Sequence, residues 1–331
     1  MKIIIPVAGM GTRLRPHTNT SPKVLIEVAG KPILAHILDG VVDLDPEEIV
    51  FIIGPMGEQV ERFVSGNYKF RGTSYIFQKE ALGLGHAVYL ARERVGAQPT
   101  LILLGDTIFE ADLPGALKKG RGFVGLKQVD DPTRFGVAIL DKGKVIRLLE
   151  KPSKPPSNLA LVGIYYFKSG ASLFDALETN ISKGVKTEGE FQLTDAIQAM
   201  IDNGEEIEGL DIDGWHDCGK PSTLLETQRY LLKRSAKISD IPGSMVIPPV
   251  HISPSAEIKQ SIIGPYVTIS DGAVVERSIV SDAIIRSKAM IRSMHLEGAI
   301  IGQEAVLIGH NPSLHVGDQT YIDFSNGEAD R

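Results

Sequence analysis

Two glycines and two cations lie close together near the N-terminus of this sequence. Gly9 and Gly11 follow an aliphatic run at residues 3–5, and Arg13 and Lys23 come soon after them. A buried strand that ends in a glycine-rich turn can present backbone N–H groups to phosphate, because no Cβ keeps the ligand away. The two cations would add fixed positive charge. We therefore predict a phosphate-binding turn; the alternative is an ordinary strand-to-helix turn with its cations on the surface.

The segments around this turn alternate between strand-like and helix-like patterns. Predicted strands lie at residues 3–7, 49–53, 73–78, 100–104 and 123–126, and predicted helices at 33–42, 56–63 and 85–94. This alternation indicates an α/β fold whose parallel sheet is covered on both faces and binds ligands beyond the carboxyl ends of its strands. The glycine turn and Asp106 both follow predicted strands, so we expect them in one cleft.

After residue 131 the pattern becomes mixed. Asp141-Lys142-Gly143-Lys144 separates two strand-like runs and predicts a β-hairpin. The remaining predicted elements of this region are a strand at 161–167 and helices at 190–200 and 221–237. We expect this mixed region to hold a second ligand of the cleft. Residues 1–236 are thus predicted to form one catalytic domain.

The last third of the chain has a different repeat. Residues 237–249 are rich in proline, glycine and serine, and predict a linker. In residues 250–331 aliphatic side chains recur about every six positions, often before a small residue. That period indicates a parallel β-helix, in which each face contributes one inward aliphatic side chain. The alternative is an antiparallel β-domain. A final strand is expected at 320–324 and a frayed tail from residue 327.

Composition excludes several classes of protein. The 331 residues include 35 Lys and Arg against 41 Asp and Glu, a net charge of −6, which argues against a nucleic-acid-binding surface. No apolar run is long enough to span a membrane, and no charged-then-apolar leader precedes the first predicted strand. The single cysteine, Cys218, excludes an internal disulfide and fits a reducing compartment. We therefore expect a cytoplasmic protein that binds neither nucleic acid nor a membrane.

The N-terminal motifs resemble those of sugar-1-phosphate nucleotidyltransferases, which make nucleotide sugars from a nucleoside triphosphate and a sugar 1-phosphate. The family pattern G-x-G-T-R-L-x-P, then P-K-x-L and G-K-P, is matched at residues 9–16, 22–25 and 30–32. The turn lacks both the G-K-[ST] ending of a P-loop and the third glycine of a dinucleotide fingerprint. The resemblance covers nearly the whole chain. It implies a Rossmann-like doubly wound mixed sheet followed by a small left-handed parallel β-helix.

For the nucleotide, the resemblance implies an in-line attack of a sugar-phosphate oxygen on the α-phosphorus, with pyrophosphate leaving. It assigns catalytic roles to Arg13, Lys23 and Asp106, and a Mg²⁺ site to Asp106 and Asp217, because Mg²⁺ needs few protein ligands. Either aspartate could instead be a turn residue or a helix cap. The implied nucleotide-binding residues are Ala8, Gly9, Gly11, Thr12, Arg13, Gln78, Gly83 and Leu84. The Gln78 amide can both donate to and accept from a pyrimidine imide.

For the sugar phosphate, the sequence Glu150-Lys151-Pro152 matches the family's E-K-P motif. The resemblance implies that the glutamate accepts hydrogen bonds from sugar hydroxyls and that the lysine binds the phosphate. The alternative is an exposed pair at the end of a strand. The implied sugar-phosphate-binding residues are Gly136, Glu150, Lys151, Val162 and Tyr165.

Within the family, the chain is most similar to the longer type of glucose-1-phosphate thymidylyltransferase. Ala8 and the G-L-G-H-A sequence from Gly83 are equally similar to uridylyltransferases. We therefore favour dTTP only slightly over UTP, with glucose 1-phosphate as the acceptor, and we expect a homo-oligomer.

Two other functions stay open. A non-catalytic regulatory homologue would keep the fold, although such proteins usually lose the cations or the metal carboxylates. Hexapeptide helices also often carry acyltransferase activity, for which the candidate bases would be His251, His295, His310 and His315.

Overall fold

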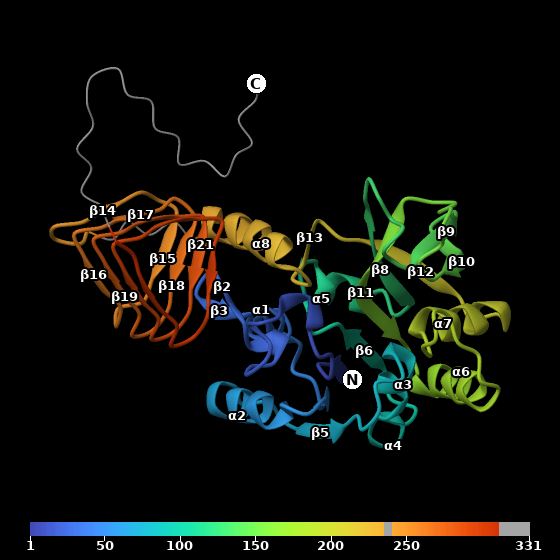
Figure 1. The fold of residues 1–331 in the computed structure, drawn as a ribbon. Helices are drawn as coiled ribbons and strands as arrows, with labels where there is room; N and C mark the ends of the chain where they lie inside the picture. The colour runs from blue at the N-terminus through green and yellow to red at the C-terminus, as the bar shows by residue number, and fades with distance from the viewer. Residues whose placement is uncertain (235–239, 311–331) are drawn as a thin grey trace.

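A nine-stranded mixed sheet forms the centre of the larger domain in the computed structural model, which describes residues 1–234 and 240–310 (Figure 1). Four neighbouring strands run parallel, and β11 runs antiparallel to β6 and β8 on either side of it. In sheet order the strands are β5 (Thr73–Phe77), β4 (Glu48–Ile53), β1 (Lys2–Pro6), β6 (Thr100–Leu103), β11 (Leu159–Phe167), β8 (Gly122–Gln128), β12 (Ile207–Asp211), β10 (Lys144–Leu149) and β9 (Val137–Asp141).

Helices cover both faces of this sheet because its central strands are apolar on both sides. Ile3 and Ile5 of β1 belong to one buried cluster, and Ile4 between them belongs to the other. The first face packs on α1 (Ile33–Asp39), α2 (Gly57–Asn67), α5 (Leu113–Lys118) and α8 (Pro221–Arg234). The second packs on α3 (Leu84–Tyr89), α4 (Arg92–Val95), α6 (Gly170–Ser182) and α7 (Leu193–Asp202). The doubly wound fold is confirmed.

Short elements connect the sheet to the cleft. They are the 3₁₀ turns η1 (Thr12–Leu14), η2 (Lys23–Leu25) and η3 (Val42–Leu44), the hairpin β2 (Glu27–Val28) and β3 (Lys31–Pro32), and the antiparallel pair β7 (Thr107–Glu110) and β13 (Gly214–Asp217). The predicted β9–β10 hairpin is present. Two predicted helices differ from the structure in their bounds. The stretch 85–94 forms two short helices, and α7 begins at Leu193 because residues 187–190 form a tight turn.

The C-terminal part is a parallel β-helix of three four-stranded sheets, consistent with the left-handed hexapeptide-repeat type, and the antiparallel alternative is wrong. The first sheet is β14 (Met245–Val246), β17 (Ile262–Ile263), β20 (Ile279–Ser281) and β23 (His295–Glu297). The second is β15 (Val250–Ile252), β18 (Val267–Ile269), β21 (Ala283–Ile285) and β24 (Ile300–Ile301). The third is β16 (Glu257–Lys259), β19 (Val274–Glu276), β22 (Met290–Arg292) and β25 (Val306–Ile308).

Each coil of the β-helix is slightly shorter than three perfect hexapeptides. Val250 pairs with Val267 one coil later, whereas Ile269 pairs with Ile285, so successive coils differ in the length of their corners. The strand β14 pairs with β17 and lies inside the stretch 237–249 that was expected to be a linker. His315, the strand expected at 320–324 and the tail expected from residue 327 fall outside the described residues.

Candidate functional site

The phosphate-binding turn leaves β1 at Pro6 and is fixed by its neighbours. Val7 donates its N–H to the Ile52 carbonyl. A Cβ on Gly54 would lie 2.6 Å from the Ala8 carbonyl oxygen, so that oxygen packs where only glycine fits. Gly11 has φ 59°, and a Cβ there would lie 3.0 Å from the side chains of Lys23 and Thr18. A Cβ on Gly9 would meet nothing within 4 Å. The main chain at Gly9 is therefore open to a ligand.

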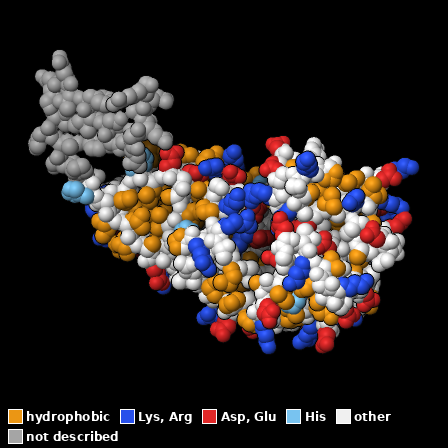
Figure 2. Space-filling model, turned by 45° about the vertical axis from the view of Figure 1, so that its right-hand side comes forward, with side chains coloured by type: hydrophobic (Ala, Val, Ile, Leu, Met, Phe, Trp, Pro, Cys, Tyr) orange, Lys and Arg blue, Asp and Glu red, His pale blue; other side chains and the backbone are white. Residues whose placement is uncertain are grey.

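A cavity of about 390 Å³ opens beside this turn, beyond the carboxyl ends of β1 and β6. Figure 2 shows a hollow near the middle of the molecule, with acidic side chains inside it and a group of Lys and Arg side chains beside it. The cavity brings together seven of the predicted residues, which are Ala8, Gly9, Lys23, Gln78, Gly83, Leu84 and Asp106. It is also lined by residues that the sequence analysis did not select, among them Met10, Ala81 and Glu190.

Asp106 and Lys23 form an ion pair at the floor of the cavity, with 2.7 Å between Lys23 Nζ and Asp106 Oδ2. The lysine side chain is 8% exposed and the aspartate 40%. A buried ammonium needs such a partner because transfer out of water is costly for a charge. The exposed part of the Asp106 carboxylate remains accessible to a ligand.

The ladder of β7 and β13 brings the second aspartate to the same place. Asp217 pairs with Thr107, the neighbour of Asp106, and the Cys218 N–H donates to the Asp106 carbonyl. Arg13 is exposed and outside the cavity lining, but a Cβ on Gly219 would lie 2.8 Å from Asp217 Oδ1 and 3.3 Å from Arg13 Nη2. Arg13 and the Asp217 carboxylate therefore border one region, and the main chain at Asp106 is joined to it through Cys218. Gly11 and Thr12 support this turn without lining the cavity.

The donor set at these aspartates fits a hard cation that takes its other ligands from a substrate. Within the described parts of the chain, no group of three or more His, Cys, Asp or Glu side chains could hold a metal ion. Two carboxylates beside an open cleft suit Mg²⁺, which usually binds through one or two carboxylates, substrate phosphates and water.

Gln78 and Gly83 lie at the other end of the cavity. The Gln78 amide nitrogen donates to the Gly83 carbonyl at 3.3 Å and lies 3.2 Å from His86 Nδ1. Burial lowers the pKa of His86. Gly83 has φ 107°, and a Cβ there would lie 2.6 Å from the Phe191 carbonyl oxygen. The Gln78–Gly83 loop therefore packs against the segment that precedes α7.

The E-K-P residues lie in a second cluster outside this cavity lining. Glu150 accepts a hydrogen bond from the Thr194 hydroxyl at 2.7 Å, and a Cβ on Gly136 would lie 3.1 Å from its Oε2. The Lys151 ammonium lies 3.6 Å from Glu150 Oε1 and 3.4 Å from Glu188 Oε2. The structure thus joins Gly136, Glu150 and Lys151 and adds Thr194 and Glu188.

Val162 and Tyr165 of β11 are buried in the two opposite clusters of the core. The Val162 side chain is buried in the cluster between the sheet and α1, α2, α5 and α8, so only its main chain could contact a ligand. Burial raises the pKa of Tyr165, and the charges of Glu150 and Asp106 raise it further. Tyr165 is therefore a buried, neutral side chain that does not line the cavity.

A turn at residues 187–190 connects the two parts and was missed by the sequence analysis. Thr187 and Glu190 exchange main-chain hydrogen bonds, and Glu188 and Gly189 between them have φ of 53° and 81°. Glu190 lines the cavity while Glu188 pairs with Lys151. Gly189 was the one local signal, because it has no Cβ to oppose a positive φ, whereas Glu188 is not a residue that tight hairpin turns favour.

The histidines proposed for acyl transfer are scattered. The His251 ring packs on the β2–β3 hairpin, since a Cβ on Gly30 would lie 2.4 Å from it. His295 is exposed on β23, on a different sheet of the β-helix. Within the described residues, these histidines do not come together in one site, which speaks against the acyl-transfer alternative.

The pattern of conserved positions that defines the nucleotidyl transferase family matches residues 2–234. The chain belongs to the nucleotidyl transferase family. The match spans the mixed sheet, both aspartates and α8, and ends before the β-helix. Recognition of the family from its motifs is therefore confirmed.

This nucleotidyl transferase is 32% identical to a glucose-1-phosphate thymidylyltransferase of Streptomyces antibioticus, over 98% of this chain and 100% of that one. It is 33% identical to the UTP–glucose-1-phosphate uridylyltransferase AglF of Haloferax volcanii, over 72% of this chain and 100% of that one. A solved structure described as a putative glucose-1-phosphate thymidylyltransferase of Bacillus anthracis, in complex with sucrose, matches with a TM-score of 0.62 and 30% identity, over 72% of this chain and 98% of that one. None of the helices in residues 1–234 and 240–310 is long and apolar enough to cross a membrane.

Proposed function

We propose that this nucleotidyl transferase transfers a nucleotidyl group from dTTP or UTP to a sugar 1-phosphate, with glucose 1-phosphate as the favoured acceptor. One observation carries the proposal. The cavity places an open glycine turn, the Lys23–Asp106 pair and Gln78 around one space at the carboxyl ends of parallel strands. These are the groups that a base, a triphosphate and a metal would require.

Alignment and charge stabilisation are the main tasks of the protein in this reaction, because the two substrates are anions that repel each other. In the proposed complex, main-chain N–H groups near Gly9 bind phosphate oxygens, and Arg13 stabilises the leaving pyrophosphate. Lys23 neutralises charge near the α-phosphorus. Mg²⁺ held by Asp106 and Asp217 would supply further neutralisation of the phosphate oxygens.

The acceptor would bind at the E-K-P cluster. Glu150, held by Thr194, is oriented to accept hydrogen bonds from sugar hydroxyls. Lys151 is exposed and offers its ammonium to the sugar phosphate. Gly136 leaves room beside the carboxylate that a larger residue would fill. The attacking phosphate oxygen would then lie between Lys151 and Lys23.

The choice between dTTP and UTP is not decided by Gln78. Uracil and thymine have the same imide edge, so a Gln78 amide can select either of them over cytosine but cannot separate them. The thymidylyltransferase relative matches the chain over its full length, β-helix included, whereas the uridylyltransferase relative matches 72% of it. This difference in coverage favours dTTP.

A regulatory homologue without activity is the second candidate. The assembled Lys23–Asp106 pair and the nearby Asp217 speak against it, since a subunit without catalysis has no need to keep them together. We further propose that the protein works in the cytoplasm and forms a homo-oligomer.

The test is release of pyrophosphate by the full-length protein with Mg²⁺, in a grid of dTTP, UTP, CTP, ATP and GTP against several sugar 1-phosphates. We expect turnover with dTTP and UTP, highest with glucose 1-phosphate, and loss of turnover with EDTA that excess Mg²⁺ restores. A folded protein that releases no pyrophosphate with any pair would exclude the catalytic proposal and favour the regulatory homologue.

A further inference from the structure

One sheet of the β-helix is packed against the catalytic domain. In Figure 1 the sheet that contains β18 and β21 lies beside β2 and β3. The outward side chains Thr268 and Ile284 of this sheet are 0% exposed. Ile284 belongs to the same buried cluster as Ile26 and Val28 of the segment that follows Lys23. The β-helix thus shares a core with the part of the chain that carries the phosphate-binding motifs.

Arg286 lies in this interface at the end of β21. It is 7% exposed, and its main chain is held by a hydrogen bond from its N–H to the Ile301 carbonyl. Burial lowers the pKa of Arg286, and the Glu27 carboxylate of the N-terminal segment opposes this shift. The charge of Arg286 in turn adds to the effect of burial in lowering the pKa of His17 on the same segment. The Glu27 carboxylate is itself held by the Ser270 hydroxyl of the β-helix.

His17 connects this interface to the phosphate-binding turn. A Cβ on Gly302 of the β-helix would lie 3.9 Å from His17 Nδ1, and the His17 N–H donates to the Leu14 carbonyl. The next residue, Thr18, is buried and donates its hydroxyl to the Gly11 carbonyl at 2.9 Å. The β-helix, His17, Thr18 and Gly11 therefore form a continuous series of contacts that ends at the turn.

We propose that Arg286 is a positioning residue for nucleotide binding, which acts from the β-helix through His17 and Thr18 on the turn at Gly11. The proposal rests on the proposed function, because the turn is taken as the site of the triphosphate. The buried Arg286 side chain fills the interface and attracts Glu27 across it. The segment is thus held against the β-helix at His17, beside Gly302, and at Glu27, which accepts from Ser270. Loss of this support would let the turn move, and small displacements of binding groups are costly to an aligned reaction.

The chain offers a matched control at the same interface. Arg229 of α8 forms a bidentate pair with Asp282, at 2.7 Å and 2.5 Å. This pair also joins the catalytic domain to the β-helix, but among the described residues neither partner makes a hydrogen bond or ion pair with the turn at Gly11 or with His17. Arg229→Met therefore weakens the interface without removing the support for the turn.

The experiment compares Arg286→Met, Arg286→Lys and Arg229→Met in the full-length protein. Pyrophosphate release gives KM for dTTP and for glucose 1-phosphate, and thermal unfolding gives stability. We expect Arg286→Met to raise KM for dTTP about tenfold and to leave KM for glucose 1-phosphate within about twofold. Arg286→Lys should restore most of the loss because it keeps the charge. Arg229→Met should lower the unfolding midpoint and leave KM for dTTP unchanged.

A second measurement needs no catalysis. Amide hydrogen exchange at Leu14 and His17, whose N–H groups close the turns after Gly11, should be faster in Arg286→Met and unchanged in Arg229→Met. If the wild-type protein releases no pyrophosphate, the proposed function fails while this measurement still tests the positioning role. If Arg286→Met does not fold, Thr18→Val takes its place and should raise KM for dTTP in the same way. Wild-type exchange and wild-type KM for dTTP, or equal effects of Arg286→Met and Arg229→Met, would overturn the proposal.

Discussion

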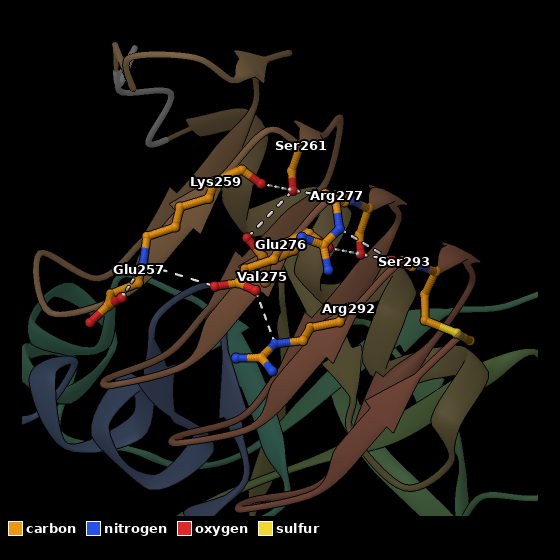
Figure 3. A network of polar contacts seen from close by, with 10 residues as sticks. Glu257, Lys259, Ser261, Val275, Glu276, Arg277, Arg292 and Ser293 are labelled. Atoms are coloured by element: carbon orange, nitrogen blue, oxygen red, sulfur yellow. Dashed lines mark hydrogen bonds and ion pairs between the residues drawn. The ribbon is translucent and has the colours of Figure 1, made fainter. Parts of the chain in front are cut away.

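The strands of the nine-stranded sheet and those of the β-helix contribute to the protein in different ways. In the sheet, the parallel strands β1 and β6 end side by side, and the residues that follow them, such as Gly9 and Asp106, line a cavity. In the β-helix every strand pairs with the coil before or after it, and the aliphatic side chains face inward. Its outward charges neutralise one another, as Lys259, Glu276 and Arg292 do along one face (Figure 3). Continuous strand pairing stabilises the β-helix, whereas the loops that follow the ends of β1 and β6 leave polar groups free to bind a ligand.

This contrast separates activity from stability. Substitutions in the cavity should change catalysis more than folding, substitutions inside the β-helix should do the reverse, and substitutions on its charged outer face should change little.

The largest effect is expected from Asp106→Asn. Loss of the negative charge removes one proposed Mg²⁺ ligand, so kcat should fall by roughly 10²–10³-fold. The asparagine oxygen can still accept a hydrogen bond from Lys23, but the buried ammonium loses its negative partner, so the unfolding free energy should fall by about 1–3 kcal/mol without loss of the fold. Steady-state pyrophosphate release and thermal unfolding measure the two. A variant that loses its fold as well as its activity would make Asp106 a structural residue.

Next comes Ile263→Ala, inside the β-helix and away from the catalytic domain. Ile263 is fully buried, and its truncation should lower the unfolding free energy by about 2–4 kcal/mol. At 25 °C kcat should stay within about twofold of wild type, because the cavity is untouched. Denaturant titration and the pyrophosphate assay measure these changes. A drop in kcat without a drop in stability would contradict the separation.

A smaller effect is expected from Gln78→Ala. Without the amide, kcat/KM should fall about tenfold for dTTP and for UTP alike, which corresponds to about 1.4 kcal/mol, within the range for one unmade hydrogen bond. The reason is that both bases present the same imide edge. Parallel titrations with dTTP, UTP and CTP measure the effect. A change in the dTTP-to-UTP ratio would show that Gln78 also senses the methyl group or the ribose.

The smallest effect is expected from Glu276→Gln on the outer face of the β-helix. Glu276 pairs with Arg292 at 2.9 Å and with Lys259 at 3.9 Å. Partly exposed pairs of this kind contribute about 0.5 kcal/mol, and salt weakens them further. The unfolding free energy should therefore fall by no more than about 1 kcal/mol, less at high salt, with wild-type kcat. A loss of several kcal/mol would mean that the charged face is part of the stable core.

The sequence was informative where local pattern and position in the fold coincide. Apolar strands followed by Gly9 or Asp106 predicted one cleft, because the ends of parallel strands converge. The recurrent aliphatic residues predicted the β-helix, because each coil repeats the same inward position. The coil length was less predictable, since it depends on corners that carry no strict pattern.

Contacts between distant segments could not be predicted. The Lys151–Glu188 pair joins residues that are far apart in the chain, and neither segment has a pattern that indicates the other. The same holds for the hydrogen bond from Ser270 to Glu27. The preference between dTTP and UTP was also out of reach, because the residue selected for the base faces an edge that both bases share.

Gly54 shows how a residue outside the cavity can limit the evolution of the site. Its missing side chain makes room for the Ala8 carbonyl, 2.6 Å from where a Cβ would lie. A mutation to any larger residue would displace the phosphate-binding turn before a single ligand-binding side chain had changed. We therefore expect substitutions at position 8 to be tolerated only while position 54 remains glycine. Directed evolution of nucleotide preference should fail in libraries that vary this glycine.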